Sequence, residues 1–253
     1  MKKNILFFLF LSAAGGLNLL LNLSCNTTEP NDELNPGRRD YTWTVDTLAG
    51  LNNPRYRMWG SSPTDIWATT GSNWNVSISH FDGSKWHSYG VPGIIQPNAI
   101  YGFSDNNIFF GDENGKIWKY DGNNWTLFAE LTKDGHSNIV FSNIWGENIN
   151  SLYVAGAYPE VNGGFNMSVI AHFKNGNWNM LNTNELYGIV DRIYKNFPDN
   201  KIYLQVIGGT NFTDSTKVYE YINGKYQKLY GNLWTQGLQS DICLINNEVI
   251  FFG

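Results

Sequence analysis

One short phrase recurs four times along this chain, and it limits the possible folds more than any other feature. Each copy begins with an aromatic residue, passes through a polar turn into an apolar run, and closes later with Asp-Gly or Asn-Gly and a second aromatic residue. The leading aromatic residues Trp59, Tyr101, Trp145 and Tyr194 are separated by 42, 44 and 49 residues. Such an interval indicates a repeat architecture, in which each copy is one structural unit.

Each copy contains four short extended segments separated by turn residues, which is the pattern of β-strands joined by hairpins. The first copy predicts strands over residues 57–60, 66–70, 76–81 and 86–89. Between the last two strands lies Asp82-Gly83. A tight hairpin needs a residue with positive φ, and glycine adopts it without steric cost. We therefore expect a hairpin turn at this point of every copy.

The second segment of each copy is apolar on both of its faces. These segments are Ile66-Trp67-Ala68, Ile108-Phe109-Phe110, Leu152-Tyr153-Val154-Ala155 and Ile202-Tyr203-Leu204. A half-buried strand would alternate between apolar and polar residues, so both faces are expected to be covered. Radially stacked sheets cover both faces, and a four-stranded propeller blade has this repeat length. We predict an all-β chain, a β-propeller of four-stranded antiparallel blades, with the four leading aromatic residues at equivalent inner positions around a shared axis.

The number of blades is the open point of this prediction. The segment Tyr41 to Leu48 resembles the last strand of a copy, and we expect it to be an N-terminal outer strand that completes the final blade. Four full copies follow, and a fifth begins at Asp241 and ends at Gly253. Closed propellers commonly have four to eight blades. We therefore expect an incomplete propeller, an arc that is truncated at the C-terminus.

The N-terminal residues 1–25 have the features of an export signal: Lys2-Lys3, an apolar core, and a small residue before Cys25. The stretch Leu21 to Cys25 resembles a bacterial lipobox, although Asn22 stands where such motifs usually carry Leu. This resemblance implies that the chain is cut before Cys25 and that the thiol receives a lipid. An uncleaved membrane anchor is the alternative, but glycines and asparagines interrupt the roughly 20 apolar residues that a spanning helix needs.

Residues 26–40 are polar and contain two prolines, so we predict a flexible tether between the lipid and a domain over 41–253. If Cys25 carries lipid, Cys243 has no partner for a disulfide and is expected to be a small buried apolar residue. The net charge is −5, and the 17 basic residues are scattered. Nucleic-acid binding requires a basic stripe, so no nucleic-acid partner is expected. We predict a cell-envelope protein held at the membrane by its N-terminal lipid.

The phrase Trp59 to Ala68, followed by Ile78 to Trp86, resembles repeats in lipoproteins of Bacteroidetes-like bacteria. It is also similar to the propeller repeats of sialidases and of sensor histidine kinases. The resemblance extends over residues 41–253 and implies the architecture. The sialidase Asp-box has the order Ser-x-Asp-x-Gly-x-x-Trp, whereas Asp82 and Gly83 are adjacent here. No sialidase residue can therefore be carried over to this chain.

No motif of a known catalytic, metal-binding or phosphate-binding site is present, so we predict no catalytic residue, no metal and no cofactor. His80 and His172 occupy the same position of the repeat, which favours a structural role over a ligand role. Aspartates in the turns are expected to bind their own backbone. The run from Asp112 to Gly115 could hold calcium weakly, but it lacks the later bidentate acid of a calcium loop, and a plain turn is favoured.

The copies differ in the connection between their second and third strands. It is short in the second copy and longer at 71–75, 156–167 and 208–216. In a propeller these connections share one rim, so we predict a binding surface there that contains Trp74, Tyr158, Phe165 and Phe212 together with Asn73, Asn162, Asn166 and Asn211. Exposed aromatic rings beside amides suit sugars. The alternative is that loop length varies wherever packing does not constrain it.

Three functions remain open at this point. The leading hypothesis is a membrane-anchored, non-catalytic propeller that recognises a glycan or an envelope protein. The second is a propeller-type carbohydrate-active enzyme, a glycosidase, lyase or glycosyl transferase, which would need paired carboxylates or a Tyr or His base near the pore. No such pair is evident in the sequence. The third is an extracellular sensor or assembly scaffold, which would use the same kind of binding face.

Overall fold

The computed structural model describes residues 42, 45, 55–70, 74–159, 167–196, 200–208, 215–233, 242–245 and 248–251. The chain divides into two compact units, Met1–Asp46 and Thr47–Gly253. In the first unit only Thr42 and Val45 are described, and neither belongs to a strand or helix. The predicted signal peptide, Cys25, the tether and nearly all of the predicted outer strand at 41–48 therefore lie outside the described residues. No helix in the described ranges has the length and apolar character needed to span a membrane.

The described residues of the second unit form four four-stranded antiparallel sheets and one hairpin. Blade 1 consists of β1 (Arg55–Ser62), β2 (Asp65–Thr70), β3 (Ile78–Phe81) and β4 (Trp86–Tyr89). Blade 2 consists of β5 (Ala99–Ser104), β6 (Asn107–Gly111), β7 (Lys116–Tyr120) and β8 (Trp125–Glu130). Blade 3 consists of β9 (Val140–Asn148), β10 (Ser151–Tyr158), β11 (Met167–Lys174) and β12 (Asn177–Met180). Blade 4 consists of β13 (Ile189–Asn196), β14 (Lys201–Ile207), β15 (Thr216–Ile222) and β16 (Lys225–Asn232). The hairpin consists of β17 (Ile242–Ile245) and β18 (Glu248–Phe251).

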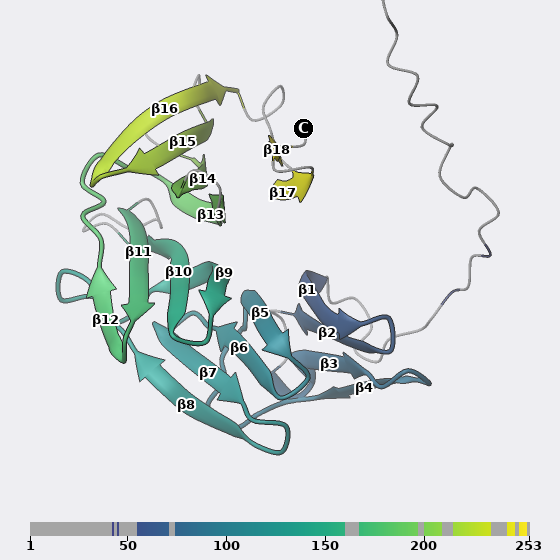
Figure 1. The fold of residues 1–253 in the computed structure, drawn as a ribbon. Coiled ribbons are helices and arrows are strands. Elements are labelled where there is room, and N and C mark those ends of the chain that lie inside the picture. Colours follow the sequence, from purple (N-terminus) through teal and green to yellow (C-terminus); the bar gives the residue numbers. More distant parts are fainter. Residues whose placement is uncertain are drawn as a thin grey trace, which may run out of the picture. The chain divides into compact units, whose positions relative to one another are not determined.

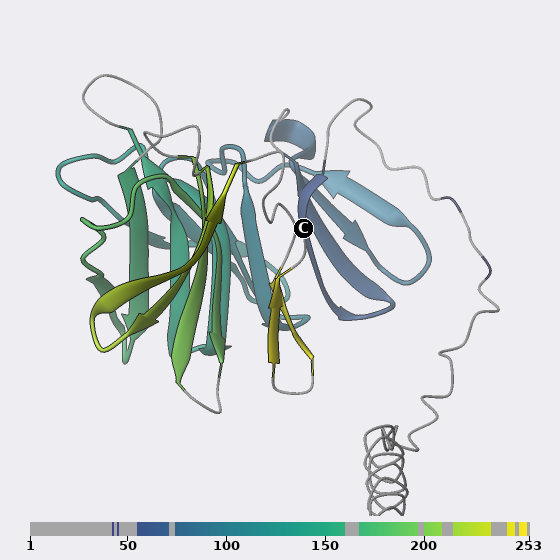
Figure 2. The ribbon, with the colours of Figure 1, turned by 90° about the horizontal axis from the view of Figure 1, so that it is seen from above.

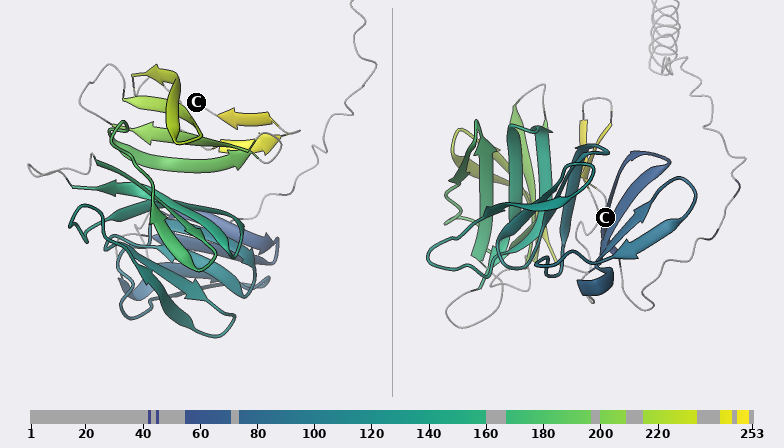
Figure 3. Two further views of the ribbon diagram at one scale, coloured as in Figure 1. Left: turned by 60° about the vertical axis from the view of Figure 1, so that its left-hand side comes forward. Right: turned by 90° about the horizontal axis from the view of Figure 1, so that it is seen from below.

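The four sheets are arranged as propeller blades. In every sheet, strands that are consecutive in sequence are hydrogen-bonded neighbours. The first strands β1, β5, β9 and β13 lie on the inner side, and the last strands β4, β8, β12 and β16 lie on the outer side (Figure 1). The inner strands of successive blades contact one another, and the sheets pack face against face (Figure 2; Figure 3). The predicted all-β propeller of four-stranded blades is confirmed.

The leading aromatic residues occupy equivalent positions on the inner strands. Each lies opposite an aromatic residue of the second strand, in the pairs Trp59 and Trp67, Tyr101 and Phe109, Trp145 and Tyr153, and Tyr194 and Tyr203. Packing requires a glycine after the leading aromatic residue of blade 2. A Cβ atom on Gly102 would lie 2.5 Å from the indole ring of Trp59. The hydroxyl of Tyr101 donates a hydrogen bond of 3.0 Å to the carbonyl of Gly146. The aromatic residue of one blade therefore rests on the glycine of the next.

The core lies between the blades. One cluster of buried apolar side chains joins blades 1 and 2, another joins blades 2 and 3, and a third joins blades 3 and 4. Phe109 belongs to the cluster between blades 2 and 3, whereas its neighbour Phe110 belongs to the cluster between blades 1 and 2, and both are fully buried. Adjacent residues of a strand point to opposite faces of its sheet. The second strand is therefore buried on both faces because a neighbouring blade covers each of them.

Two kinds of hairpin close the outer edge of the blades. In blade 1 the turn has four residues, and Asp82 Oδ1 accepts hydrogen bonds from the backbone amides of Ser84 (2.9 Å) and Lys85 (3.0 Å). In blade 3 the turn has only two residues, Asn175 and Gly176, which adopt φ of 52° and 84°. Positive φ at both central residues is the property of a type I′ turn. The predicted hairpin with a positive-φ glycine is thus present in both forms.

Several strand boundaries differ from the predicted ones by one or two residues, and two of the differences have a clear physical cause. The third strand of the first copy begins at Ile78, because Trp74–Val76 forms the short 3₁₀ turn η1. In the third copy, β10 continues to Tyr158, so Gly156 lies within the strand instead of at the start of a loop. A Cβ atom on Gly156 would lie 1.9 Å from the carbonyl oxygen of Val140 on β9. This glycine allows close approach of two strands and does not mark a turn.

Candidate functional site

Most of the binding surface that the sequence predicts lies outside the described residues. Trp74 is placed only by its backbone, as the first residue of η1. The described ranges leave out Asn73, Asn162, Phe165, Asn166, Asn211 and Phe212. The structure does not bring these side chains together or separate them, and the rim site remains a prediction.

Tyr158 is the one residue of that set whose side chain is described, and it is not an exposed loop residue. It is the last residue of β10 and is 5% exposed. Its hydroxyl donates a hydrogen bond of 2.6 Å to Asp134 Oδ2, and burial raises the pKa of the phenol to about 12. The ring packs in the cluster between blades 2 and 3. Tyr158 therefore holds the connection between β8 and β9 in place.

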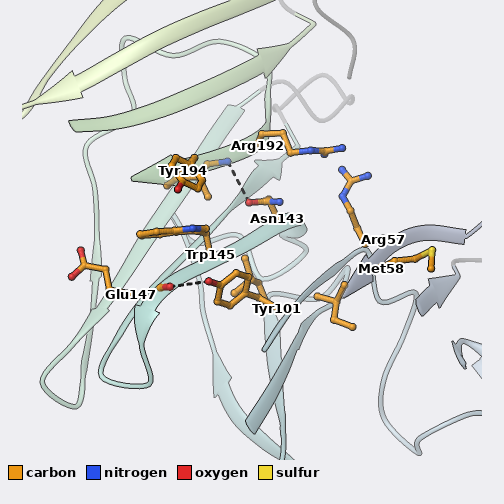
Figure 4. A pocket seen from close by; sticks show the side chains of 12 residues that line it. Arg57, Met58, Tyr101, Asn143, Trp145, Glu147, Arg192 and Tyr194 are labelled. Carbon is orange, nitrogen blue, oxygen red and sulfur yellow. Dashed lines mark hydrogen bonds between the residues drawn. The ribbon is translucent and has the colours of Figure 1, made fainter. Parts of the chain in front are cut away.

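A cavity of about 460 Å³ lies among the inner strands of all four blades. We call it the central cavity (Figure 4). Its lining consists of Arg57, Met58, Ile100, Tyr101, Asn143, Ile144, Trp145, Gly146, Glu147, Arg192, Ile193 and Tyr194. Aromatic walls with a small number of convergent polar groups are typical of small-ligand sites. The sequence analysis missed this cavity because its charged and amide side chains come from three strands, β1, β9 and β13, that are far apart in sequence.

Two arginines that line the central cavity are held by one aspartate, Asp191. Asp191 Oδ1 accepts a hydrogen bond of 2.8 Å from Arg57 Nη2, and Asp191 Oδ2 accepts one of 2.6 Å from Arg192 Nη1. Arg57 Nε also donates to the carbonyl of Ser142, at 3.3 Å. The guanidinium groups of Arg57 and Arg192 point toward one another (Figure 4). Asp191 thus bridges the two guanidinium groups.

β-Bulges place the polar residues of this cavity. Arg57, Asn143 and Arg192 each lie two residues before a leading aromatic residue, and in each of their strands the pairing skips the residue immediately before them. In blade 2 the equivalent residue is Ala99, which is the first residue of β5, so the paired strand has no residue before it. A bulge inserts one extra residue and re-aims the side chains beside it. When the copies are aligned, this position reads Arg, Ala, Asn, Arg, which is the signal that could have located the site.

The remaining polar groups of the central cavity are held by neighbouring blades. Asn143 Oδ1 accepts a hydrogen bond of 3.3 Å from the backbone amide of Ile193. Lys195 Nζ donates to Glu147 Oε1 and forms an ion pair with it. The rings of Trp145 and Tyr194 lie 5.5 Å apart between blades 3 and 4. These contacts join the inner strands of blades 3 and 4 and give the cavity a defined shape.

A second cavity, of about 530 Å³, lies between blades 3 and 4, and we call it the interblade groove. It is lined by Glu147, Asn148, Asn150, Ser151, Tyr153, His172, Lys174, Asn175, Lys195, Asn200, Ile202, Tyr221, Ile222, Asn223 and Gly224. Glu147 borders both this groove and the central cavity. The imidazole of His172 stacks on Tyr153 at 3.9 Å. Burial, and then the charge of Lys174, lower the pKa of His172, so this side chain is neutral at pH 7.

The histidines at the shared repeat position have the structural role that was predicted. His80 stacks on Trp67 at 4.0 Å, as His172 stacks on Tyr153, and its Nε2 lies 2.6 Å from Asp65 Oδ1. The ring therefore covers an aromatic residue of the neighbouring strand. No group of three or more His, Cys, Asp or Glu side chains that could hold a metal ion occurs among the residues that the structure places.

The turn from Asp112 to Gly115 also follows its prediction. Asp112 Oδ1 accepts hydrogen bonds from the backbone amides of Asn114 (2.9 Å) and Lys116 (3.1 Å). Asp112 Oδ2 accepts a third from the indole nitrogen of Trp118, at 3.1 Å. Both oxygens of the carboxylate are thus engaged by the protein. This aspartate orders its own turn and anchors a core tryptophan.

No protein-family model and no characterised protein sequence matches the chain. Among solved structures, it is similar to YCF48 bound to D1 peptide, with 14% identity over 73% of this chain and 58% of that one, at a TM-score of 0.46. It is also similar to the extracellular domain of the one-component system BT4673 from B. thetaiotaomicron, with 12% identity over 82% of this chain and 32% of that one, at a TM-score of 0.44. The computationally designed Ika8 protein shares 13% identity over 75% of this chain and 52% of its own length, at a TM-score of 0.42. The chain spans less than two thirds of each of these structures.

Proposed function

We propose that this chain is a non-catalytic binding module of the cell envelope, tethered by lipid on Cys25, and that its ligand enters the central cavity. The observation that carries the proposal is the convergence of Arg57, Asn143 and Arg192 on a cavity with aromatic walls. Such a combination orients a polar ligand through hydrogen bonds while the aromatic surface contributes contact area.

The ion pairs made by the two carboxylates Asp191 and Glu147, beside the cavity, favour binding over hydrolysis. Glycoside hydrolysis uses a pair of carboxyl groups, one of which must carry a proton to the leaving oxygen. Asp191 is held by Arg57 and Arg192, and Glu147 is held by Lys195. Both carboxyl groups are therefore already engaged by basic side chains of the protein, which favours a binding role over the role of a proton donor.

The proposed location rests on residues 1–25 and on the lipobox-like sequence before Cys25. Expression in a bacterial host with an alkyne-tagged fatty acid tests it. We expect the tag to be incorporated into the full chain and to be lost in Cys25→Ser. Labelling of Cys25→Ser at the level of the unsubstituted chain would contradict lipid attachment at this residue.

The proposed binding is tested with the domain from Tyr41 onward on a glycan array and by isothermal titration with any glycan retained. We expect Arg192→Met to weaken binding about tenfold or more, since a hydrogen bond to a charged group contributes about 1.5–3 kcal/mol. Lys85→Gln removes a charge from the exposed hairpin of blade 1 and is the matched control. The same titrations with Trp74→Ala and Phe212→Ala test the predicted rim site, because weaker binding in these variants would place the ligand there. Release of a smaller sugar from the glycan would overturn the non-catalytic proposal.

A further inference from the structure

The charges that line the interblade groove are largely balanced within the protein. Lys195 Nζ donates to Glu147 Oε1, so the cation and the anion at this border pair with one another. His172 is neutral at pH 7, because burial and then the charge of Lys174 lower its pKa. Lys174 is the remaining charged side chain of the lining, and it is exposed to solvent. Complementarity of charge between site and ligand therefore favours an uncharged ligand in this groove.

Side-chain amides make up much of the remaining lining. Five asparagines line the groove: Asn148, Asn150, Asn175, Asn200 and Asn223. They lie at or beside four hairpin turns, which join the first strand to the second and the third strand to the fourth in blades 3 and 4. Because successive strands of a blade are antiparallel, these turns lie at the same end of the blades. Amides from two blades are thereby brought to one groove.

The turns explain why asparagine stands at these positions, but they leave most of the amides unused. Asn175, Asn200 and Asn223 adopt φ of 52°, 57° and 51°, which asparagine tolerates better than most residues. Asn148 Oδ1 accepts a hydrogen bond of 2.9 Å from the backbone amide of Asn150. Within the described part of the chain, the side-chain amides of the other four asparagines make no hydrogen bond. Each of these amides can therefore donate to a ligand and accept from it.

We propose that the interblade groove is a second binding site, which takes a linear chain of uncharged sugars. This goes beyond the proposed function, because the groove shares only Glu147 with the central cavity. Its volume of about 530 Å³ is in the range of small-ligand sites. The asparagine amides bond the sugar hydroxyls, which also donate and accept. Tyr221 and Ile222, both partly exposed on the same lining, give the apolar C–H groups of the sugar a contact surface.

An uncharged peptide is the competing ligand, and the strands that border the groove favour the sugar chain. An extended peptide gains affinity by pairing its backbone with an unpaired strand edge. Ser151, His172 and Tyr221 come from β10, β11 and β15, which are hydrogen-bonded to a neighbouring strand on both sides. At these residues the groove offers side chains in place of a strand edge. Side chains that bond hydroxyls are suited to a ligand with hydroxyls on every unit.

The test is isothermal titration of the full chain, in a detergent without sugar groups, with cellohexaose, mannohexaose and laminarihexaose. Oligogalacturonate and a Gly-Ser repeat peptide are the charged and the peptide probes. We expect at least one neutral hexasaccharide to bind, and to bind more tightly than both of these probes.

Three variants remove amides from the groove. Asn150→Ala, Asn175→Gly and Asn223→Gly are each expected to weaken binding of that hexasaccharide about threefold to tenfold, as for the loss of one neutral hydrogen bond. Glycine keeps the positive φ of the two turns, so these variants should fold. Asn123→Ala removes an exposed amide from the corresponding hairpin of blade 2 and should bind as the unsubstituted chain does. Urea midpoints verify that every variant is folded.

The outcomes separate this inference from the proposed function. Binding of none of the three hexasaccharides would overturn the second site, whereas the central cavity is judged by the effect of Arg192→Met on any glycan that the array retains. Hexasaccharide binding that is lost in Arg192→Met and unchanged in the asparagine variants would place the sugar in the central cavity and also overturn the second site. Tighter binding of oligogalacturonate than of every neutral sugar would overturn the uncharged ligand class. Binding of the Gly-Ser peptide that is weakened by the asparagine variants, without binding of a sugar, would replace the sugar by a peptide.

Discussion

At the scale of single residues, the repeated aromatic-glycine pair is explained by contacts between blades. Trp59 packs on Gly102, where any side chain would meet the indole ring, and Tyr101 bonds the carbonyl of Gly146. Blade 4 carries Lys195 in place of the glycine, and this lysine instead pairs with Glu147 of blade 3. The glycine is thus required where a large ring from the preceding blade must approach the inner strand.

This explanation predicts the effect of Gly102→Ala. The new Cβ atom would lie 2.5 Å from the ring of Trp59, so we expect a loss of about 1–3 kcal/mol in the free energy of unfolding, as for other overpacked cores. Urea denaturation measures it. Adding Trp59→Leu removes the colliding ring and should restore part of the loss, which makes the two substitutions non-additive.

Gly156→Ala is the matched comparison for that experiment. Its Cβ atom would meet the backbone carbonyl of Val140 at 1.9 Å, and no side-chain substitution can remove that obstacle. We expect a greater loss of stability than for Gly102→Ala. If Gly156→Ala were the milder of the two, the close approach of β9 and β10 would not be as described.

The histidine in the interblade groove predicts a dependence of stability on pH. Burial and the neighbouring Lys174 lower the pKa of His172 below its ordinary value of 6.5. Between that lowered pKa and 6.5 the unfolded chain binds more protons than the folded one, so stability is complete above pH 6.5 and falls as the pH decreases below it. Urea midpoints at pH 7.5 and 5.5 should show this loss.

The variant His172→Phe retains a ring on Tyr153 and cannot take up the proton. Its urea midpoint should therefore change less between the two pH values than that of the unsubstituted domain. An equal decrease in both proteins would show that another group is responsible.

At the scale of strands and hairpins, the sequence was a reliable guide wherever local chemistry decides the structure. Turn residues and doubly apolar runs approximately located the four strands of the first blade and the second strand of every blade, because a hairpin depends on residues that are adjacent in sequence. The boundaries at Ile78 and Gly156 were wrong, since the 3₁₀ turn η1 and the approach of Val140 shape those segments. A glycine that permits close packing looks the same in sequence as one that forms a turn.

The turn glycines of two hairpins, Gly176 and Gly122, are expected to differ in how much stability is lost when alanine replaces them. Gly176 has φ of 84° with open space around it, so Gly176→Ala should cost about 1–2 kcal/mol for the left-handed conformation alone. Gly122 has φ of 99°, and a Cβ atom there would also lie 2.9 Å from Cβ of Asn106. Gly122→Ala should therefore be the more destabilising of the two in thermal denaturation. The reverse order would contradict the close approach of Gly122 to Asn106.

At the scale of the propeller unit, Arg57 joins blade 1 to blade 4. It donates to Asp191 of blade 4 and to the carbonyl of Ser142 of blade 3. These residues are 134 and 85 positions away in sequence. Such a contact forms only after all four blades are in place, so it reports on the assembly of the whole unit.

Removal of this carboxylate is expected to loosen the centre of the propeller. Asp191→Ala leaves the guanidinium groups of Arg57 and Arg192 without their shared anion, and we expect a loss of about 2 kcal/mol in the free energy of unfolding. In the double variant Arg57→Met with Asp191→Ala, one of the two facing cations is gone, so the loss should be smaller than the sum of the single ones. Strict additivity would show that the pair does not interact in solution.

By itself the sequence determined the all-β class, the four-stranded blade, the positions of the leading aromatic residues and the structural role of His80 and His172. These features follow from local periodicity, turn chemistry and the interval of the repeat, which are all readable along one chain. Only the tertiary structure revealed the central cavity and the interblade groove. Their charged residues come from strands far apart in sequence, and the bulges before Asn143 and Arg192 that re-aim them become visible only when the strands are paired.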